Sequence, residues 1–291
     1  MDLMIIINLL IAGIFLGALY ALMSTGLTLI WGTVGILNFA HGAIITLGGY
    51  MVWVGLQYVG LNYVLSLVIV IMFSLFLGFI LELFIFRPFR GKTGEFMNTI
   101  YCSLAFAESM AGIILIVFGP RYKKLPYIST GVIKVSNIII MTTHELVLVI
   151  LSISILISFW IFLKKHKYGL AMRAISQDRF AAQLMGINLN KVYLLTVGVG
   201  CLFAGVSGAF LGTVYFLSPH LGDMPLVFAF VIIVFGGLGS IQGTIAAAFI
   251  LGLFQSTVGY LLGLGWSAAI FFLFMMLTIL FRPSGLFGEA A

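Results

Sequence analysis

The stretch GILNFAHGAIITLGGY (Gly35–Tyr50) places an asparagine, a histidine and four glycines inside a long run of apolar residues. The chain around it has 291 residues, of which 63% are hydrophobic and only 8% are charged. A soluble domain carries about 25% charged residues, so this chain cannot cover a globule with hydrated side chains. We therefore expect an integral membrane protein, with this stretch inside its membrane-spanning part.

Apolar runs follow one another along the whole chain. Because a helix needs about 20 apolar residues to cross the hydrocarbon layer, and several runs are shorter, we expect about eight to ten membrane elements, some of them broken or re-entrant. The sequence therefore predicts an all-α polytopic membrane protein. The runs are Met4–Met23, Thr25–Phe39, Ala43–Val59, Tyr63–Phe86, Met97–Phe118, Leu146–Leu163, Val192–Phe216, Leu226–Ile241, Thr244–Leu262 and Trp266–Phe281.

The chain is predicted to be one transmembrane domain, residues 1–291, with the hydrophilic segment 164–191 inside it. Its two ends are loosely alike. A helix with closely spaced glycines precedes the opening stretch, and another precedes VFGGLGSIQG (Val234–Gly243). Transporters built from two repeats carry broken helices at matching positions, so we expect two pseudo-repeats.

The opening stretch is expected to be a break in a membrane helix. An unpaired backbone group in hydrocarbon costs several kcal/mol, so a break is tolerated only where protein or a water-filled cavity satisfies the backbone. Gly42, Gly48 and Gly49 would permit the break and a close approach of neighbours. Asn38 and His41 either line a solute path or hold the break together by hydrogen bonds, and both interpretations stay open.

Two further features were assigned to the same path. Glu108 lies well inside an apolar run, where a carboxylate costs at least about 2.5 kcal/mol on insertion scales. Its helical face, shared with Tyr101, Ala105 and Gly112, is expected to look inward. Glu108 serves either transport or, protonated, a hydrogen bond to a neighbouring helix. The second break adds the glycines Gly236, Gly237 and Gly239.

The segment Lys164–Lys191 is predicted to contain a short helix between two spans. Its alanines favour helix, Gly186 lies where a left-handed C-terminal cap would end it, and Asn188 or Asn190 could cap the next span. Ten of the 14 basic residues, including those of this segment, group away from the loop Pro120–Thr143. By the positive-inside rule the segment is cytoplasmic and that loop external, so the basic charge indicates orientation rather than binding of nucleic acid.

No catalytic or metal constellation is found in the sequence. GKT (Gly91–Thr93) lacks the glycine that a phosphate-binding loop requires five residues earlier, where Phe86 stands. HELVL (His144–Leu148) lacks the second histidine of a helical zinc site. Ser218, His220 and Asp223 are sequence neighbours, which is weak support for a triad. We expect no enzyme and no cofactor bound by this chain.

Three stretches together resemble the branched-chain amino acid ABC-transporter permeases of the LivH type. They are Gly26–Met51, which contains NFAHG, Tyr168–Thr196 and Val231–Ser256. The resemblance implies a second, LivM-like permease, two cytoplasmic subunits that hydrolyse ATP, and an external substrate-binding protein. It also implies that the segment 164–191 docks on the ATPase. The residues expected to carry this coupling are Arg173, Asp178, Arg179, Ala181, Ala182 and Gly186.

The family implies an importer for branched-chain amino acids in the bacterial inner membrane that works by alternating access. Two alternatives stay open. A permease of the same fold could carry urea, short amides or a sugar. An ion-coupled secondary transporter also uses broken helices, although the scarcity of membrane carboxylates argues against it. The expected coupling helix could also lie on the lipid surface, with its basic residues on anionic headgroups.

Overall fold

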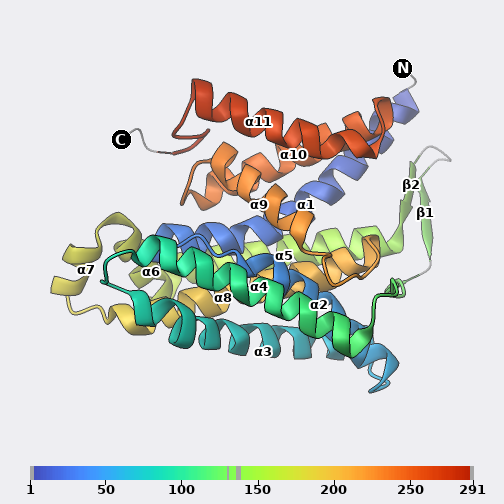
Figure 1. The fold of residues 1–291 in the computed structure, drawn as a ribbon. Coiled ribbons are helices and arrows are strands. Elements are labelled where there is room, and N and C mark those ends of the chain that lie inside the picture. Colours follow the sequence, from blue (N-terminus) through green and yellow to red (C-terminus); the bar gives the residue numbers. More distant parts are fainter. Residues whose placement is uncertain (1–2, 130, 136–138, 289–291) are drawn as a thin grey trace. The chain divides into compact units, whose positions relative to one another are not determined.

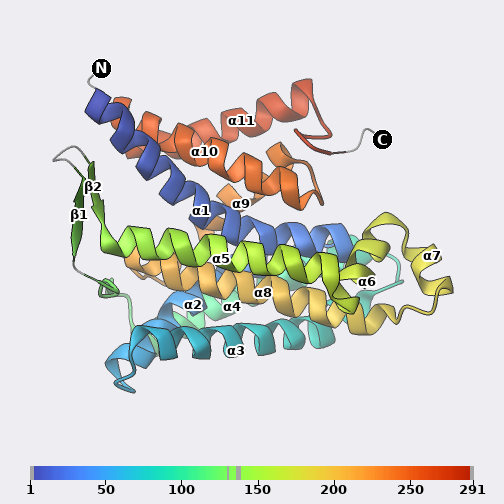
Figure 2. The same cartoon turned by 180° about the vertical axis from the view of Figure 1, so that it is seen from behind.

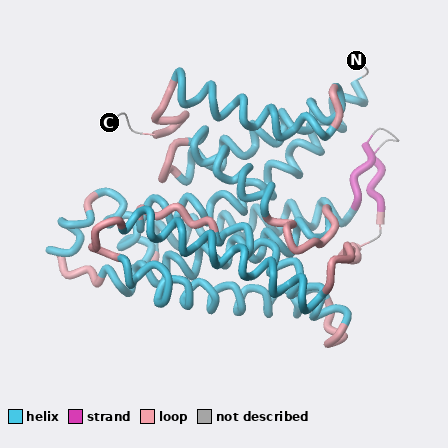
Figure 3. Tube along the Cα trace, viewed as in Figure 1, coloured by secondary structure: helices cyan, strands magenta, loops and turns pink. Residues whose placement is uncertain are grey.

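The computed structural model describes residues 3–129, 131–135 and 139–288, and helices dominate this part of the chain (Figure 3). In chain order the elements are α1 (Leu3–Val34), α2 (Ala40–Gln57), α3 (Tyr63–Leu81), the π-helix η1 (Glu82–Phe86), the 3-10 helix η2 (Arg87–Phe89), α4 (Glu95–Phe118), β1 (Val132–Val135), β2 (Ile139–Thr142), α5 (Thr143–Lys165), α6 (Lys167–Gln177), α7 (Arg179–Leu184), α8 (Leu189–Val214), α9 (Asp223–Gly236), α10 (Ile241–Leu261), the 3-10 helix η3 (Leu264–Trp266) and α11 (Ser267–Phe281).

The predicted all-α membrane fold is confirmed. In the described part of the chain, six helices are long and apolar enough to cross a membrane, and α9 and α11 are shorter apolar helices. The runs expected as two elements before Phe39 form the single helix α1. The polar residues between them do not end it, because the Thr25 hydroxyl donates to the Ala21 carbonyl one turn earlier (2.6 Å).

The helices group into two compact units, and three of the four unit boundaries fall inside α1, α5 and α9, the fourth between α4 and β1. The α8 unit comprises Gly26–Leu125 and Ser158–Leu226. The α10 unit comprises Met1–Thr25, Pro126–Ile157 and Val227–Ala291.

In the α8 unit, α8 packs along both α2 and α3, as the two opposite views show (Figures 1 and 2). Glycines make this close approach possible. A side-chain carbon on Gly208 would overlap the Ile45 carbonyl of α2, and one on Gly205 would overlap the Ser74 hydroxyl of α3. Backbone therefore meets backbone here, which is how small residues drive helix association in membranes.

In the α10 unit, the first half of α1 lies against α10. Gly17 and Gly252 face each other with no room for side chains. The Tyr20 hydroxyl donates to the Gln255 side chain, and the Ser256 hydroxyl donates to the Leu9 carbonyl (2.8 Å). The side chains of Tyr20, Gln255 and Ser256 are thus paired within the unit, as buried polar groups require.

The segment Pro120–Thr143, expected as an external loop, contains the antiparallel hairpin β1–β2. Val132 lies opposite Thr142, and Val135 lies opposite Ile139. The β-branched residues of this short stretch favour strand. Residues 130 and 136–138 of the expected loop lie outside the described residues.

Substituting Gly208 by alanine is expected to destabilise the protein, because the new methyl group would overlap the α2 backbone. Overpacking of this kind costs about 1–3 kcal/mol. Gly112 of α4 is the matched control, since nothing lies within 4 Å of an added carbon there. Gly112→Ala should be neutral or gain roughly 0.5–1 kcal/mol from helix propensity. Thermal unfolding in detergent measures both, and equal unfolding temperatures for the two variants would contradict the packing.

Candidate functional site

The first expected break is present and separates α1 from α2. Gly35 ends α1 with a left-handed backbone (φ +77°), which favours glycine. The Phe39 amide precedes α2 and donates to the Ser103 hydroxyl of α4 (3.2 Å). The break is therefore closed by a side chain from a helix more than sixty residues further along.

The glycines after the break do not interrupt a helix, although the sequence predicted that they would permit the break. Gly42, Gly48 and Gly49 all lie inside α2 and do not interrupt it. Gly42 lies against the carbonyl of Gly222, the residue that precedes α9, and Thr46 accepts a hydrogen bond from the Gly222 amide (2.9 Å). Close approach, the other role predicted for these glycines, is what the structure contains.

Asn38 and His41 are both completely buried. In the side chain of Asn38, neither Nδ2 nor Oδ1 has a hydrogen-bond partner among the described residues. Leaving a buried polar group unpaired costs about 1–3 kcal/mol. The His41 ring lies beside Gly26, where an added carbon would come within 3.2 Å of its Cε1 atom. The break thus holds an amide that still has a donor and an acceptor to offer.

Glu108 does not face inward, which corrects the expectation from its sequence. The buried residues of α4 are Thr99, Ser103 and Ile114, whereas Tyr101 and Glu108 are exposed. At 100° per residue, Ser103 and Glu108 lie about 140° apart around the helix. Helical spacing identifies residues that share a face but not which face is covered. Thr99 and Ser103 can be buried because their hydroxyls donate to carbonyls of their own helix.

The structure therefore does not bring Asn38 and Glu108 together. α4 presents Ser103 to the break and Glu108 to the opposite side. Glu108 makes no hydrogen bond or ion pair with the part of the chain that the structure describes. A carboxylate within an apolar helix is left uncovered by its own chain.

The second expected break is also present, between α9 and α10. Gly237 (φ +106°) and Gly239 (φ +87°) have left-handed backbones, and the Ser240 hydroxyl caps α10 by accepting from the Gly243 amide. Gly236 lies against Gly243 and Thr244 at the start of α10, whereas Gly237 lies against Ser284 and Gly288 of the C-terminal segment. Leu286 and Phe287 donate their amides to the carbonyls of Phe235 and Gly236 (2.9 and 3.1 Å).

These contacts give Gly236 and Gly237 a packing role at the end of α9. Both residues belong to the α10 unit, whereas Asn38, His41, Gly42 and Glu108 belong to the α8 unit.

The segment 164–191 forms two helices, α6 and α7, where one was expected. Asp178 separates them with an extended backbone (φ −151°, ψ 109°). Its carboxylate accepts from the amides of Phe180 and Ala181 (2.8 and 2.9 Å), so it caps α7. A capping aspartate pairs the first amides of a helix, which explains why the chain turns here.

The end of α7 is as predicted. Gly186 has a left-handed backbone (φ +82°) and donates its amide to the Gln183 carbonyl (3.0 Å). The Ile187 amide reaches the Ala182 carbonyl (3.2 Å), which completes a Schellman motif. The Asn188 side chain then caps α8 by accepting from the Lys191 amide (3.2 Å), which confirms one of the two predicted caps.

The exposed surface of α7 differs from the predicted one. Ala182 is 4% exposed and faces its own chain, whereas Ala181, Arg173 and Arg179 are exposed. Sequence reasoning missed three large apolar side chains that point outward, Phe180 (71% exposed), Leu184 (73%) and Met185 (84%). The spacing of four between Phe180 and Leu184 was the available signal, since it puts both on one face of α7, and Met185 follows directly. A charge at position 182 would thus disturb the fold of α7 before it disturbed docking.

Comparison with known proteins supports one family over nearly the full length. The chain is 25% identical to BraD of Pseudomonas aeruginosa, covering 96% of this chain and 95% of that protein. It is 28% identical to LivH of Escherichia coli K12, covering 95% and 94%. Both are named high-affinity branched-chain amino acid transport system permease proteins.

A shorter match reaches the fructose import permease FrcC of Rhizobium meliloti, 28% identical over 39% of this chain and 32% of that protein. No solved structure matches the chain. The family model described as "Branched-chain amino acid transport system / permease component" matches residues 9–280. The chain therefore belongs to the family of permease components of branched-chain amino acid transport systems.

Proposed function

We propose that the chain is one of two membrane permease subunits of an ATP-driven importer for branched-chain and related hydrophobic amino acids. Its partners would be a second, LivM-like permease, two cytoplasmic ATPase subunits and an external substrate-binding protein, in the bacterial inner membrane. As a permease component it is not an enzyme, and ATP would be hydrolysed by the partners. The names of the two full-length relatives support this substrate class.

The observation that carries the proposal is the exposed apolar face of α7 and the residue that follows it. Phe180, Leu184 and Met185 are exposed on a capped helix that lies outside the membrane-spanning helices. Burying one such side chain in a partner gains about 1.5–3 kcal/mol. The Asp178 cap and the Gly186 motif hold the helix in a fixed shape, which suits a lever that an ATPase moves. The exposed Arg173 and Arg179 add charge for the rim of that contact.

Glu108 supports a second protein surface within the membrane. Lipid tails offer no hydrogen bond, so a carboxylate on an apolar helix needs protein or water beside it. A second permease packed on this face of α4 would supply both, with the solute path between the two subunits. Asn38 lies on the other side of α4 from Glu108, at the α1–α2 break, where its unpaired side-chain amide would bind trapped water or solute.

Replacing Phe180 by serine is expected to weaken association with the ATPase at least about tenfold, because a buried aromatic anchor is lost. Phe216, 63% exposed just after the other end of α8, is the matched control. Co-purification in mild detergent measures the association. Equal ATPase recovery with Phe180→Ser and Phe216→Ser would instead favour a helix that lies on lipid.

Neutralising Glu108 tests the path. Glu108→Ala is expected to lower the uptake rate by about tenfold or more if the carboxylate touches solute or its water, with ATPase recovery unchanged. Glu108→Gln keeps the size and one acceptor and separates charge from hydrogen bonding. Asn38→Ala should change uptake in the same assay. Unchanged kinetics in all three variants would return these residues to a structural role.

Competition defines the substrate. In proteoliposomes with the complete complex, excess leucine, isoleucine or valine should suppress uptake of labelled leucine by more than about 90%, as binding at one site requires. Fructose, urea and acetamide should leave it unchanged. Suppression by fructose would favour the sugar-permease alternative, for which the shorter match to a fructose import permease is the supporting observation.

A further inference from the structure

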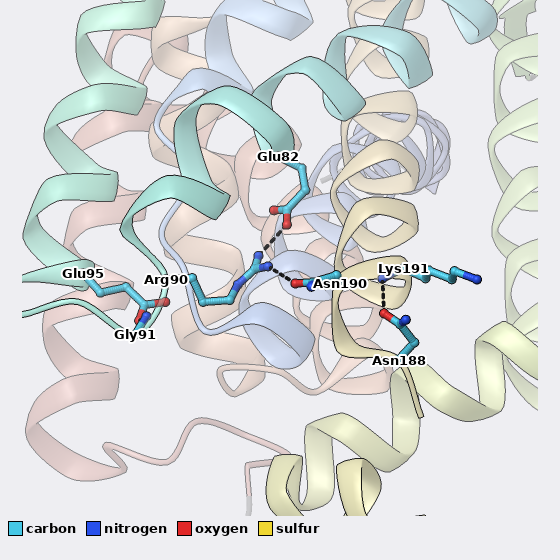
Figure 4. A network of polar contacts seen from close by, with 7 residues as sticks. All are labelled: Glu82, Arg90, Gly91, Glu95, Asn188, Asn190 and Lys191. Carbon is cyan, nitrogen blue, oxygen red and sulfur yellow. Dashed lines mark hydrogen bonds and ion pairs between the residues drawn. The ribbon is translucent and has the colours of Figure 1, made fainter. Parts of the chain in front are cut away.

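A polar network joins α3, α4 and α8 at the end of the α8 unit where α6 and α7 lie (Figures 1 and 4). Its centre is Arg90, in the loop between η2 and α4. One guanidinium nitrogen, Nη2, contacts Glu82 Oε1 (2.5 Å), and the other, Nη1, donates to Asn190 Oδ1 (3.1 Å). Arg90 thus bridges the end of α3 to the start of α8.

The ion pair is a buried one. The Glu82 side chain is 1% exposed and that of Arg90 11%. The π-helix η1 begins at Glu82 and the 3-10 helix η2 follows it, which brings Arg90 beside Glu82. π-Helical turns are rare and occur frequently at functional sites.

The network reaches α7 through an aromatic ring. The Arg90 guanidinium carbon lies 4.3 Å from the centre of the Tyr193 ring, and that of Arg179, the first residue of α7, lies 5.3 Å from it. Both distances are within the range of cation–π attraction. The Tyr193 hydroxyl is buried and has no hydrogen-bond partner among the described residues, so the ring makes these contacts and the hydroxyl does not.

The same loop is tied to α4. The Gly91 amide donates to Glu95 Oε2 (2.6 Å), and Glu95 is the first residue of α4 (Figure 4). The loop after η2 therefore contacts α3, α4 and α8 directly, and α7 through Tyr193.

We propose that Arg90 is the positioning residue that transmits movement of α7 to the membrane helices α3 and α8, with Tyr193 as the link. The proposal rests on the proposed function, in which α7 docks on an ATPase. Arginine suits this role because its planar fork holds Glu82 and Asn190 at once and still lies over the Tyr193 ring. Lysine could pair with Glu82 but could not make the other two contacts together.

The test uses the complete complex in proteoliposomes and measures ATP hydrolysed per solute imported. Arg90→Lys keeps the charge beside Glu82 and is expected to raise this ratio at least about fivefold, the lower range of typical coupling between sites. Tyr193→Leu should raise it similarly. Tyr193→Phe keeps the ring, and Lys92→Met removes an exposed charge two residues from Arg90, so both controls should match the unmodified ratio.

Unfolding temperature and ATPase recovery are measured on every variant. Transmission through Arg90 is supported if a variant keeps its unfolding temperature and its ATPase recovery while the ATP hydrolysed per imported solute rises. An unchanged ratio in Arg90→Lys and Tyr193→Leu overturns it, and so does a parallel loss of stability, recovery and transport, which indicates a purely structural contact. If Arg90→Lys does not fold, the double variant Glu82→Gln/Arg90→Met, which removes both charges, takes its place. A raised ratio of ATP hydrolysed per solute then supports the proposal, and an unchanged ratio overturns it.

Failure of the proposed function is recognised separately. In that case the unmodified protein recovers no ATPase, or it takes up solute without ATP, before any variant is compared.

Discussion

The structure depends on one constraint, that a backbone N–H or C=O inside a membrane must find a partner in protein or trapped water. Both helix breaks meet it with groups from distant parts of the sequence. Ser103 of α4 accepts from the Phe39 amide at the first break, and Leu286 and Phe287 donate to the end of α9 at the second. Each break is therefore stable only while its partner segment stays in place, so a break and its partner move together.

Features set by a few neighbouring residues could be predicted from the sequence. The left-handed cap at Gly186 and the cap at Asn188 depend on contacts between residues close in the sequence, and the position of the break near Asn38 follows from Gly35; all three are present. The abundance of apolar residues likewise predicted the helical membrane fold. The pseudo-repeat rests on weak likeness between the two ends and stays a prediction.

Features set by contacts between distant helices could not be predicted. Glu108 was assigned to the covered face of α4 because a carboxylate seemed too costly to expose, but only tertiary packing decides which face is covered. Ala182 was assigned to the outside because it is small, yet smallness equally suits burial. The contact between Glu82 and Arg90 could not be predicted because a π-helix changes which residues meet, and nothing in the sequence marks that change.

α8 contacts both the polar network around Arg90 and the helix α2 that follows the first break. Asn190 and Tyr193 at its start contact Arg90, and Gly205 and Gly208 further along it meet α3 and α2 backbone to backbone. Its 26 residues span about 39 Å. Tightly packed glycine contacts leave no flexible side chain to absorb a displacement. A shift imposed at the start of α8 must therefore be carried to α2, whose first turn adjoins the buried, unpaired amide of Asn38.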